Sequence, residues 1–182
     1  MILDSGERRE FDTGAVRDIA EGKGRMDLVP LKVVGLLIDC EELKFIDDYI
    51  RTGSVDSLYT AIKCFMRNNF EDKYTAVIEL SKHFEAGCKK YGDRNWEKGI
   101  PLHCYIDSAC RHLMKFYRCD KDENHDLAFI WNLVCAIWTH ENHPELIDLP
   151  FKEEIPFACT QEEIDAEISI EGEHIVNWGD ID

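Results

Sequence analysis

Apolar residues recur every three or four positions along most of the chain after residue 31, as in Leu102, Ile106, Ala109 and Leu113. This interval matches the 3.6-residue repeat of an α-helix that buries one face. The expected helices cover residues 32–52, a segment that starts after Ser54 or Asp56, residues 72–91, residues 101–118, and a segment from Leu127 to Trp138. No stretch has the pattern of a central strand, so the sequence predicts an all-α helical bundle.

Two stretches depart from the helical pattern. Residues 1–13 look irregular, and the residues after 150 are acidic, with "EISIEGEHIV" alternating apolar and polar residues around a glycine. The alternation is compatible with a small C-terminal hairpin, and a disordered acidic tail fits the composition equally well. We therefore divide the chain into an all-α domain, residues 1–150, and an acidic C-terminal tail, residues 151–182.

The segment that precedes the first expected helix reads "GAVRDIAEGKGRMDLVPL", residues 14–31, and contains three glycines. Such a backbone turns tightly, and here it would carry Lys23 and Arg25 outward. The glycines follow neither the G-x-G-x-x-G nor the Walker pattern, so neither a Rossmann site nor a P-loop is indicated. The segment is therefore either an anion-binding loop or a solvated turn.

The chain of 182 residues has a formal net charge of −16, and the charge is unevenly distributed. Residues 153–182 contain ten Asp or Glu and no Lys or Arg, which leaves −6 on the other 152 residues. This balance argues against a nucleic-acid polymer as partner. An anionic ligand of such a chain would need a local basic pocket.

Eight cysteines lie mostly at apolar helix positions, with no C-x-x-C pair and no zinc-type spacing. We expect them to be buried, reduced thiols. No apolar run reaches the roughly 18–20 residues that cross a bilayer, and the N-terminus lacks the layout of a signal peptide. We therefore expect no membrane partner and a cytoplasmic location.

Polar side chains gather beside the apolar faces of the last two expected helices. The first group is Asp107, Arg111 and His112, and the second is Asp122, Glu123, His125 and Asn132. Each has a plain structural alternative, such as an i,i+4 ion pair, a first-turn carboxylate that complements the helix dipole, or a hydrogen-bonded core histidine. Their combination within about 25 residues favours a site.

This set of groups suits the binding or hydrolysis of a nucleoside polyphosphate. Carboxylates from separate helices can hold Mg²⁺, which prefers oxygen ligands, and the metal activates water for attack on phosphorus. Basic groups neutralise the phosphates. The basic candidates are Lys23, Arg25, Lys90 and Arg111, and the candidates for contact with the nucleoside are Tyr91, Asn95, Trp96 and Asn132.

Four blocks occur in a fixed order, namely "GAVRDIAEGKGRMDLVP", "HFEAGCKKYGDRNWEKGIP", "DSACRHLMKF" and "DENHDLAFIWNLVCAI". Through these blocks, which cover about residues 14–31 and 83–137, the chain resembles the phage and bacterial dATP/dGTP diphosphohydrolase (MazZ-like) domain. That domain is a relative of the all-α MazG-like nucleotide pyrophosphohydrolases. Residues 32–70 look like an insertion relative to shorter members.

The resemblance implies a MazG-like four-helix core, here with extra N-terminal helices. It implies an Mg²⁺-dependent enzyme, with Mn²⁺ as an alternative ion, that cleaves a purine deoxynucleoside triphosphate to monophosphate and pyrophosphate. It also implies a homo-oligomer, either a dimer or a tetramer. For a phage-encoded chain the expected location is the host cytoplasm.

The family motifs map onto this sequence residue by residue. The implied catalytic residues are Asp122, Glu123 and His125. The candidate metal ligands are Asp107, Asp122 and Glu123 from these motifs, together with Glu85 of the preceding expected helix. The substrate-binding candidates from the motifs are Lys90, Tyr91, Asn95, Trp96, Arg111, His112 and Asn132, to which Lys23 and Arg25 of the glycine-containing segment are added. The E-E-x-x-E motif of MazG proteins is absent. A second hypothesis therefore stays open, a protein that sequesters a nucleotide or nucleotide signal without cleaving it.

Overall fold

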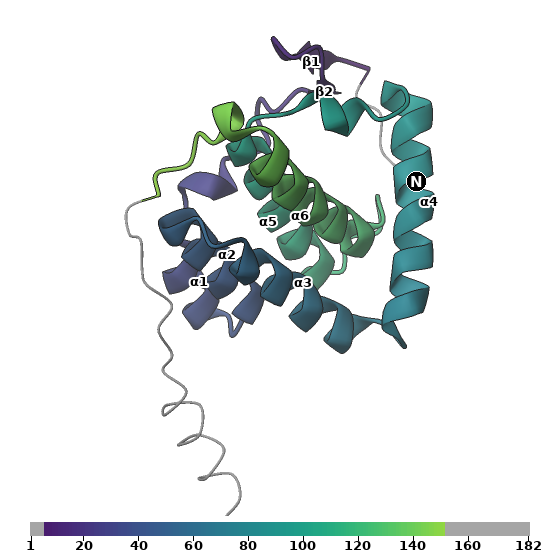
Figure 1. The fold of residues 1–182 in the computed structure, drawn as a ribbon. Helices are drawn as coiled ribbons and strands as arrows, with labels where there is room; N and C mark the ends of the chain where they lie inside the picture. Colours follow the sequence, from purple (N-terminus) through teal and green to yellow (C-terminus); the bar gives the residue numbers. More distant parts are fainter. Residues whose placement is uncertain (1–5, 152–182) are drawn as a thin grey trace, which may run out of the picture.

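The computed structural model describes residues 6–151, so the predicted C-terminal hairpin or acidic tail lies outside the described residues. In the described part six α-helices dominate, which confirms the all-α class (Figure 1). The elements are β1 (Arg8–Glu10), β2 (Val16–Asp18), η1 (Met26–Leu28), α1 (Leu31–Leu37), α2 (Glu41–Thr52), α3 (Val55–Asn69), α4 (Lys73–Tyr91), η2 (Asn95–Lys98), α5 (Leu102–Tyr117), α6 (His125–Asn142) and η3 (Pro144–Leu146), where η denotes a short 3-10 helix.

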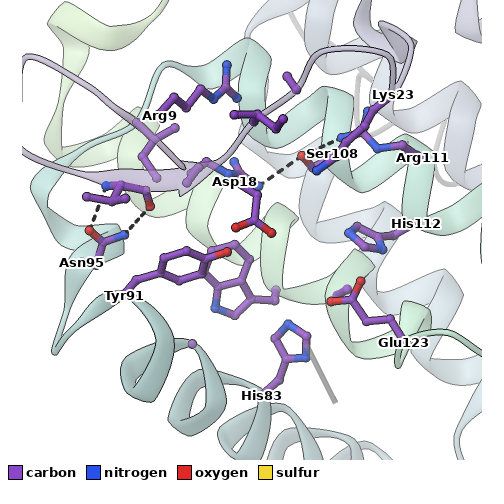
Figure 2. Close-up of a pocket in the computed structure, with 18 of the residues that line it drawn as sticks. Arg9, Asp18, Lys23, His83, Tyr91, Asn95, Ser108, Arg111, His112 and Glu123 are labelled. Atoms are coloured by element: carbon purple, nitrogen blue, oxygen red, sulfur yellow. Dashed lines mark hydrogen bonds between the residues drawn. The ribbon is translucent and has the colours of Figure 1, made fainter. Parts of the chain in front are cut away.

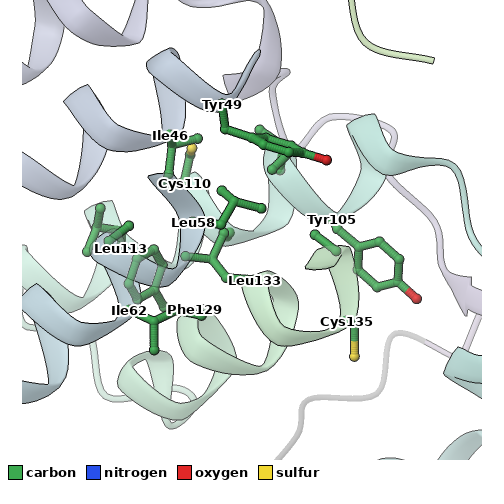
Figure 3. Packing of buried hydrophobic residues seen from close by; sticks show 14 of the residues in the cluster. Ile46, Tyr49, Leu58, Ile62, Tyr105, Cys110, Leu113, Phe129, Leu133 and Cys135 are labelled. Carbon is green, nitrogen blue, oxygen red and sulfur yellow. The ribbon is translucent and has the colours of Figure 1, made fainter. Parts of the chain in front are cut away.

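The core lies between α5 and α6 on one side and α2 and α3 on the other (Figure 3). α5 contributes Tyr105 and Leu113, and α6 contributes Phe129 and Leu133, all with no exposed surface. The Phe129 ring meets Phe65 of α3 in an edge-to-face contact, with the ring centroids 4.7 Å apart. The helical spacing seen in the sequence therefore corresponds to the buried faces of these helices.

The single helix predicted at residues 32–52 is wrong, because the chain breaks between α1 and α2. Asp39 adopts a left-handed conformation with φ of 53°, and the backbone N–H of Cys40 donates to the carbonyl of Gly35 at 2.8 Å. A Cβ atom on Gly35 would lie 2.8 Å from the carbonyl oxygen of Cys40. Glycine at this position therefore permits the close approach that folds α2 back onto α1.

The segment 32–70, predicted as an insertion, forms α1, α2 and α3. These helices supply Leu43, Ile46, Leu58 and Phe65 to the same apolar cluster as α5 and α6. Burial of an aliphatic or aromatic side chain of this size stabilises a fold by about 1.5–3 kcal/mol. The segment is therefore built into the common core, and its status as an insertion stays a prediction.

α4 lies along one side of the bundle, at the right of Figure 1, and packs mainly against α6. It begins at its N-cap Asp72, whose carboxylate accepts hydrogen bonds from two backbone N–H groups of the first turn. His83 points into the bundle and is buried. Tyr74, Val77 and Ile78 are 71%, 57% and 59% exposed. α4 thus buries His83 against the bundle and leaves the apolar side chains of Tyr74, Val77 and Ile78 at the surface.

The N-terminal segment, expected to be irregular, contains a small hairpin in which β1 and β2 pair antiparallel with Arg9 opposite Arg17. Its turn includes Gly14 with φ of 77°. The strands are polar, so periodicity gave no signal for them, and contacts with the bundle hold them in place. The hydroxyl of Thr13, for example, donates to the carbonyl of Gly99 at 2.6 Å. In Figure 1 the hairpin lies across the end of the bundle where α4 terminates.

Seven of the eight cysteines fall within residues 6–151, and all seven are free thiols. Cys40, Cys104, Cys110 and Cys135 are buried, whereas Cys119 is exposed. The four buried thiols act as small apolar side chains of the core. Within the same residues, no helix combines the length and the apolar character that a membrane span requires.

Candidate functional site

A cavity of about 320 Å³ lies between the β1–β2 hairpin with its following loop, α4, and the facing parts of α5 and α6 (Figure 2). This volume is in the range of pockets that hold small ligands. Its basic lining residues are Arg9, Arg17, Lys23, Arg111 and Lys115, and its other polar lining residues include Asp18, His83, Asn95, Ser108, His112 and Glu123. The cavity thus concentrates positive charge in an acidic chain.

Two side chains fasten β2 to the bundle and so form one wall of the cavity. Asn95 accepts the backbone N–H of Val16 at its Oδ1 and donates from its Nδ2 to the Val16 carbonyl, both at 2.9 Å. Lys90 of α4 forms an ion pair of 2.8 Å with Asp18. Burial opposes the charge of Lys90, but hydrogen bonds to Asp18 and Tyr91 outweigh burial and raise its pKa. Asn95 and Lys90 therefore position the residue between these two anchors, Arg17.

The guanidinium of Arg17 is held from several directions inside the cavity. Its Nη2 donates to Asn132 Oδ1 at 2.8 Å and to Ser108 Oγ at 3.1 Å. Its Cζ lies 5.0 Å from the ring centroid of Tyr105 and 5.9 Å from that of Trp131. Cation–π contacts of this length are favourable, more so when the cation is desolvated. Arg17 is therefore fixed in place before any ligand arrives.

Four buried polar atoms that belong to cavity-lining residues have no hydrogen-bond partner within residues 6–151. They are Arg9 Nε, Arg17 Nη1, Asp18 Oδ1 and Trp131 Nε1. A buried polar group without a partner costs about 1–3 kcal/mol, and native folds rarely keep one without a reason. Three of the four atoms are donors, so a ligand rich in acceptors, such as a phosphate, would satisfy them.

The remaining cations surround the same space. Arg111 donates to Asp107 Oδ2 at 2.8 Å and to Ser108 Oγ at 3.1 Å, so Ser108 links it to Arg17. The pKa of Lys23 is lowered, mainly by burial; the attraction of Asp18 opposes this effect, and Arg111, Lys90 and Arg17 add repulsion. Crowding of like charges disfavours the empty cavity and favours a bound anion.

Histidines and carboxylates form the opposite end of the cavity, where Figure 2 places His112 beside Glu123. His112 Nδ1 lies 2.9 Å from His125 Nδ1, and His125 Nε2 lies 2.7 Å from Asp122 Oδ1. Burial lowers the pKa of His112 well below its usual value and raises the pKa of Glu123. One donor atom each from His112, Glu123 and His125 falls within 4.8 Å of the others, a grouping able to hold a metal ion.

Aromatic groups form the third side. Tyr91 and Trp131 both line the cavity, and the His83 ring centroid lies 6.1 Å from that of Trp131. Burial lowers the pKa of His83 to about 4, so its imidazole is neutral near pH 7. An apolar, aromatic side next to a cationic side matches a ligand that has a planar ring at one end and an anion at the other.

The sequence-predicted residues distribute over three locations. The cavity lining contains Lys23, Tyr91, Asn95, Arg111, His112 and Glu123. Lys90, Asp122, His125 and Asn132 contact lining residues directly, through Asp18, Lys115, His112 and Arg17 respectively. Arg25, Glu85, Trp96 and Asp107 are not in the lining of this cavity. Asp107 also contacts a lining residue, Arg111, so eleven of the fourteen predicted residues are within one contact of the same space.

The four residues outside the lining have other partners. Arg25 pairs with Asp27, its Nε lying 2.7 Å from Oδ1, and Glu85 pairs with Lys89 on an exposed face of α4. Asp107 accepts the backbone N–H of Met26 at 2.7 Å in addition to its ion pair with Arg111.

Trp96 packs against Phe84 and Trp138 and lines a second hollow together with Glu85. Of the four carboxylates predicted as metal ligands, only Glu123 lines the cavity, and the metal-binding roles of all four stay predictions.

The sequence analysis missed Arg17, which hydrogen-bonds Asn132 and Ser108 inside the cavity. It also missed Lys115, Ser108, Trp131 and His83. A signal existed for two of them, because Arg17 lies in the glycine-containing segment and Trp131 adjoins Asn132. Arg17 was missed because only Lys23 and Arg25 of residues 14–31 were considered as ligand-binding cations.

Comparison with known families adds an independent finding. Residues 73–149 match the family model described as dATP/dGTP diphosphohydrolase, N-terminal, which confirms the resemblance predicted from the sequence motifs. The matched segment spans α4, α5 and α6 and so includes Tyr91, Arg111, His112 and Glu123 of the cavity. No curated protein and no solved structure matches the chain.

Proposed function

We propose that the chain hydrolyses purine deoxynucleoside triphosphates, dGTP or dATP, to the monophosphate and pyrophosphate with the help of a divalent metal ion. The family match over residues 73–149 supports this class of reaction. One observation carries the proposal: a single cavity has an immobilised, partly unsatisfied guanidinium on one wall and the metal-capable group of His112, Glu123 and His125 on another.

The cationic wall suits the triphosphate. Arg17 offers its unsatisfied Nη1, and Lys23, Arg111 and Lys115 add positive charge around the same space. Such groups stabilise the charge on the transferring and leaving phosphates, an effect that is strongest in a site closed to water. These residues bind and orient the phosphate chain, and Lys90 supports them by fixing Asp18 and the strand that carries Arg17.

The aromatic wall suits the nucleoside. Tyr91 and Trp131 line it, and the indole Nε1 of Trp131 has no partner within the described residues. An aromatic side chain can stack on the base of a nucleotide, and a nearby N–H group can donate a hydrogen bond to the edge of that base. The side-chain amide of Asn95 is hydrogen-bonded to the Val16 backbone, and that of Asn132 is hydrogen-bonded to Arg17 and to the Ala128 carbonyl. We therefore assign them to positioning the wall rather than to contacting the base.

The metal-capable group is where we place the catalytic residues Asp122, Glu123 and His125. A divalent ion supplies Lewis-acid stabilisation of phosphate oxygens and a nucleophilic water at neutral pH. Burial raises the pKa of Glu123, and a raised pKa makes a carboxylate a better proton acceptor. Asp122 orients the His125 ring through its hydrogen bond and is itself held by Lys115 at 2.8 Å.

The test is product analysis after incubation of the purified, folded protein with dGTP or dATP and Mg²⁺ or Mn²⁺. Chromatography of the nucleotides and an enzymatic assay for pyrophosphate should give dGMP or dAMP and pyrophosphate in equal amounts. Unaltered nucleotide with every metal, from a protein shown to be folded, would remove the hydrolytic proposal.

The second candidate is a sequestering protein that binds the nucleotide without cleaving it. The pairing of Glu85 with Lys89 and of Asp107 with Arg111 favours it, because these predicted metal ligands are engaged elsewhere. Calorimetry would then show tight binding that needs no metal, and the nucleotide would be recovered unaltered. Pyrophosphate release excludes this candidate.

The homo-oligomer also stays a proposal. The exposed Tyr74, Val77 and Ile78 on α4 form an apolar surface that a second copy of the chain would cover. Size-exclusion chromatography with light scattering should report a dimer or tetramer, and Val77→Glu combined with Ile78→Glu should shift it to the monomer. A monomeric wild type would refute the proposed assembly.

A further inference from the structure

We propose that His112, Glu123 and His125 form a site for a first-row transition-metal ion, such as Mn²⁺, Fe²⁺, Co²⁺ or Zn²⁺, and that the site discriminates against Mg²⁺. This inference deepens the proposed function, on which the role of the ion in hydrolysis rests. Binding of the ion does not depend on that function and can be measured in its absence.

The spacing of the donor atoms carries the first step. The Nδ1 atoms of His112 and His125 are 2.9 Å apart, and a carboxylate oxygen of Glu123 completes a group whose members all lie within 4.8 Å. Metal–nitrogen bonds of about 2.0–2.1 Å are usual for imidazole ligands. Two nitrogens at this separation are therefore both within reach of one ion.

The hydrogen bond between His125 and Asp122 provides the second step of the argument. His125 Nε2 lies 2.7 Å from Asp122 Oδ1, and an ionised carboxylate only accepts hydrogen bonds, so Nε2 carries the hydrogen. The lone pair of a neutral His125 is then on Nδ1, which faces His112 and Glu123. A carboxylate that holds the second nitrogen of a ligand histidine is a regular feature of metal sites, where it fixes ring orientation and raises basicity.

Asp122 is in turn held in place. Its Oδ2 pairs with the ammonium of Lys115 at 2.8 Å, and this interaction keeps the pKa of Asp122 well below its usual range. His125 is buried with 2% of its surface exposed, whereas His112 and Glu123 face the cavity. The group therefore has rigid support on its inner side and free access for water or phosphate on the other.

The chemistry of the donors decides the class of ion. Two imidazoles and one carboxylate suit Mn²⁺, Fe²⁺, Co²⁺ and Zn²⁺, whereas Mg²⁺ prefers an all-oxygen set and keeps several waters. The oxygen ligands that an Mg²⁺ site would need are elsewhere, since Asp107 bonds Arg111 and the Met26 backbone, and Glu85 pairs with Lys89. The alternative explanation is a plain hydrogen bond between two neutral imidazoles.

Titration of the metal-free, full-length protein with Co²⁺ separates these explanations without any nucleotide. We expect visible d–d absorption that saturates at one ion per chain, displacement by equimolar Zn²⁺, and no displacement by a large excess of Mg²⁺. His112→Gln should weaken Co²⁺ binding by at least 100-fold, and Asp122→Asn, which removes only the supporting carboxylate, by about 10–100-fold.

His103→Gln is the matched control, because His103 also bonds a carboxylate, Asp148, while its other ring nitrogen lies beside Cys104 Sγ rather than beside an imidazole. It should bind Co²⁺ as the wild type does. Should His112→Gln unfold, as judged by circular dichroism, Glu123→Gln replaces it, since its side chain faces the cavity. Co²⁺ affinity equal to that of the wild type in folded His112→Gln or Glu123→Gln, or displacement of Co²⁺ by Mg²⁺, would overturn the inference.

The results also separate this inference from the proposed function. Specific Co²⁺ binding in a protein that cleaves no nucleotide would retain the metal site and remove the hydrolase. Nucleotide cleavage with Mg²⁺ in a protein that fails the Co²⁺ titration would retain the hydrolase and remove this site.

Discussion

Arg17 Nη2 donates a hydrogen bond of 2.8 Å to Oδ1 of Asn132, which lies 115 residues further along the chain. Asn132 is on the buried side of α6 and uses its amide nitrogen to bond the Ala128 carbonyl at 2.8 Å. The amide oxygen of Asn132 thus accepts a hydrogen bond from the guanidinium of Arg17 in β2. This contact brings a residue of the N-terminal hairpin to the centre of the family-matched bundle.

The first prediction concerns Arg17. Arg17→Lys keeps the charge but loses the fork of donors that reaches Asn132, Ser108 and a ligand at once. Hydrogen bonds to charged groups contribute about 1.5–3 kcal/mol, so the dissociation constant for dGTP should rise about 10- to 100-fold. Calorimetric titration with dGTP measures the change.

The control is Arg25→Lys, because Arg25 bonds Asp27 and is absent from the cavity lining. Its affinity for dGTP should equal that of the wild type. Similar losses in both variants would mean that the effect comes from overall charge rather than from the cavity.

The second prediction concerns the ion pair of Lys90 and Asp18, whose side chains are only 9% and 19% exposed. Lys90→Met leaves the Asp18 carboxylate in the cavity wall without its cation. Loss of one partner of a buried ion pair lowers the free energy of unfolding by about 3–5 kcal/mol. Because this pair is partly exposed to solvent, we expect a loss at the lower end of that range for Lys90→Met. Urea unfolding monitored by circular dichroism gives the free energy.

Lys89→Met serves as the control, since the neighbouring Lys89 pairs with Glu85 in full contact with solvent. That variant should unfold at nearly the same urea concentration as the wild type. If the two lysine variants were equally stable, the Lys90–Asp18 pair would not hold β2 on the bundle.

The third prediction is a pH dependence from His83, whose pKa burial lowers from 6.5 to about 4. The unfolded chain takes up a proton near pH 6.5 and the folded chain only near pH 4. The free energy of unfolding is therefore not reduced by His83 above pH 6.5, and it falls as the pH decreases from 6.5 toward 4. Between pH 7 and pH 5, the free energy of unfolding, measured by urea denaturation at each pH, should fall by about 1–2 kcal/mol more in the wild type than in His83→Gln.

His143→Gln should change the pH dependence in the other direction. The hydrogen bond to Glu145 raises the pKa of His143, so its contribution is present at low pH and declines as the pH rises. Parallel pH profiles for the wild type and His83→Gln would show that His83 is not a buried neutral imidazole.

The fourth prediction compares two glutamates, Glu123 and Glu85, both of which the sequence analysis named as metal ligands. Glu123→Gln should lower kcat for dGTP at least 100-fold, the usual effect of losing an acid–base or metal-binding carboxylate, while dGTP binding changes little. Glu85→Gln should leave kcat unchanged, because Glu85 pairs with Lys89 outside the cavity. If kcat fell in Glu85→Gln and stayed at the wild-type value in Glu123→Gln, then Glu85 rather than Glu123 would be the catalytic glutamate.

The helices of the second half were predictable because their apolar residues follow one period and are buried on one side. Leu102, Ile106 and Leu113 show this for α5, which spans Leu102–Tyr117 where residues 101–118 were expected. The break at Asp39 was not predictable, because the apolar spacing continues through it. The hairpin was also missed, since its strands are polar and are fixed by distant partners such as Asn95.

The site was predictable to the extent that its residues are close in sequence. His112, Glu123 and His125 were named from two adjacent segments, and the fold brings them together. Arg17 was not named, because its value depends on Asn132 and Ser108, which no local pattern links to it. Glu85 shows the converse, a plausible carboxylate that the helix turns toward solvent.

The central claim is that the cavity between the hairpin and the bundle is the nucleotide site. A crystal structure with a non-hydrolysable dGTP analogue and Mn²⁺ tests it most directly. We predict the phosphates beside Arg17 Nη1 and Lys23, the base against Tyr91 and Trp131, and the ion at His112, Glu123 and His125. An analogue bound elsewhere on the protein, with this cavity free of nucleotide, would contradict the account.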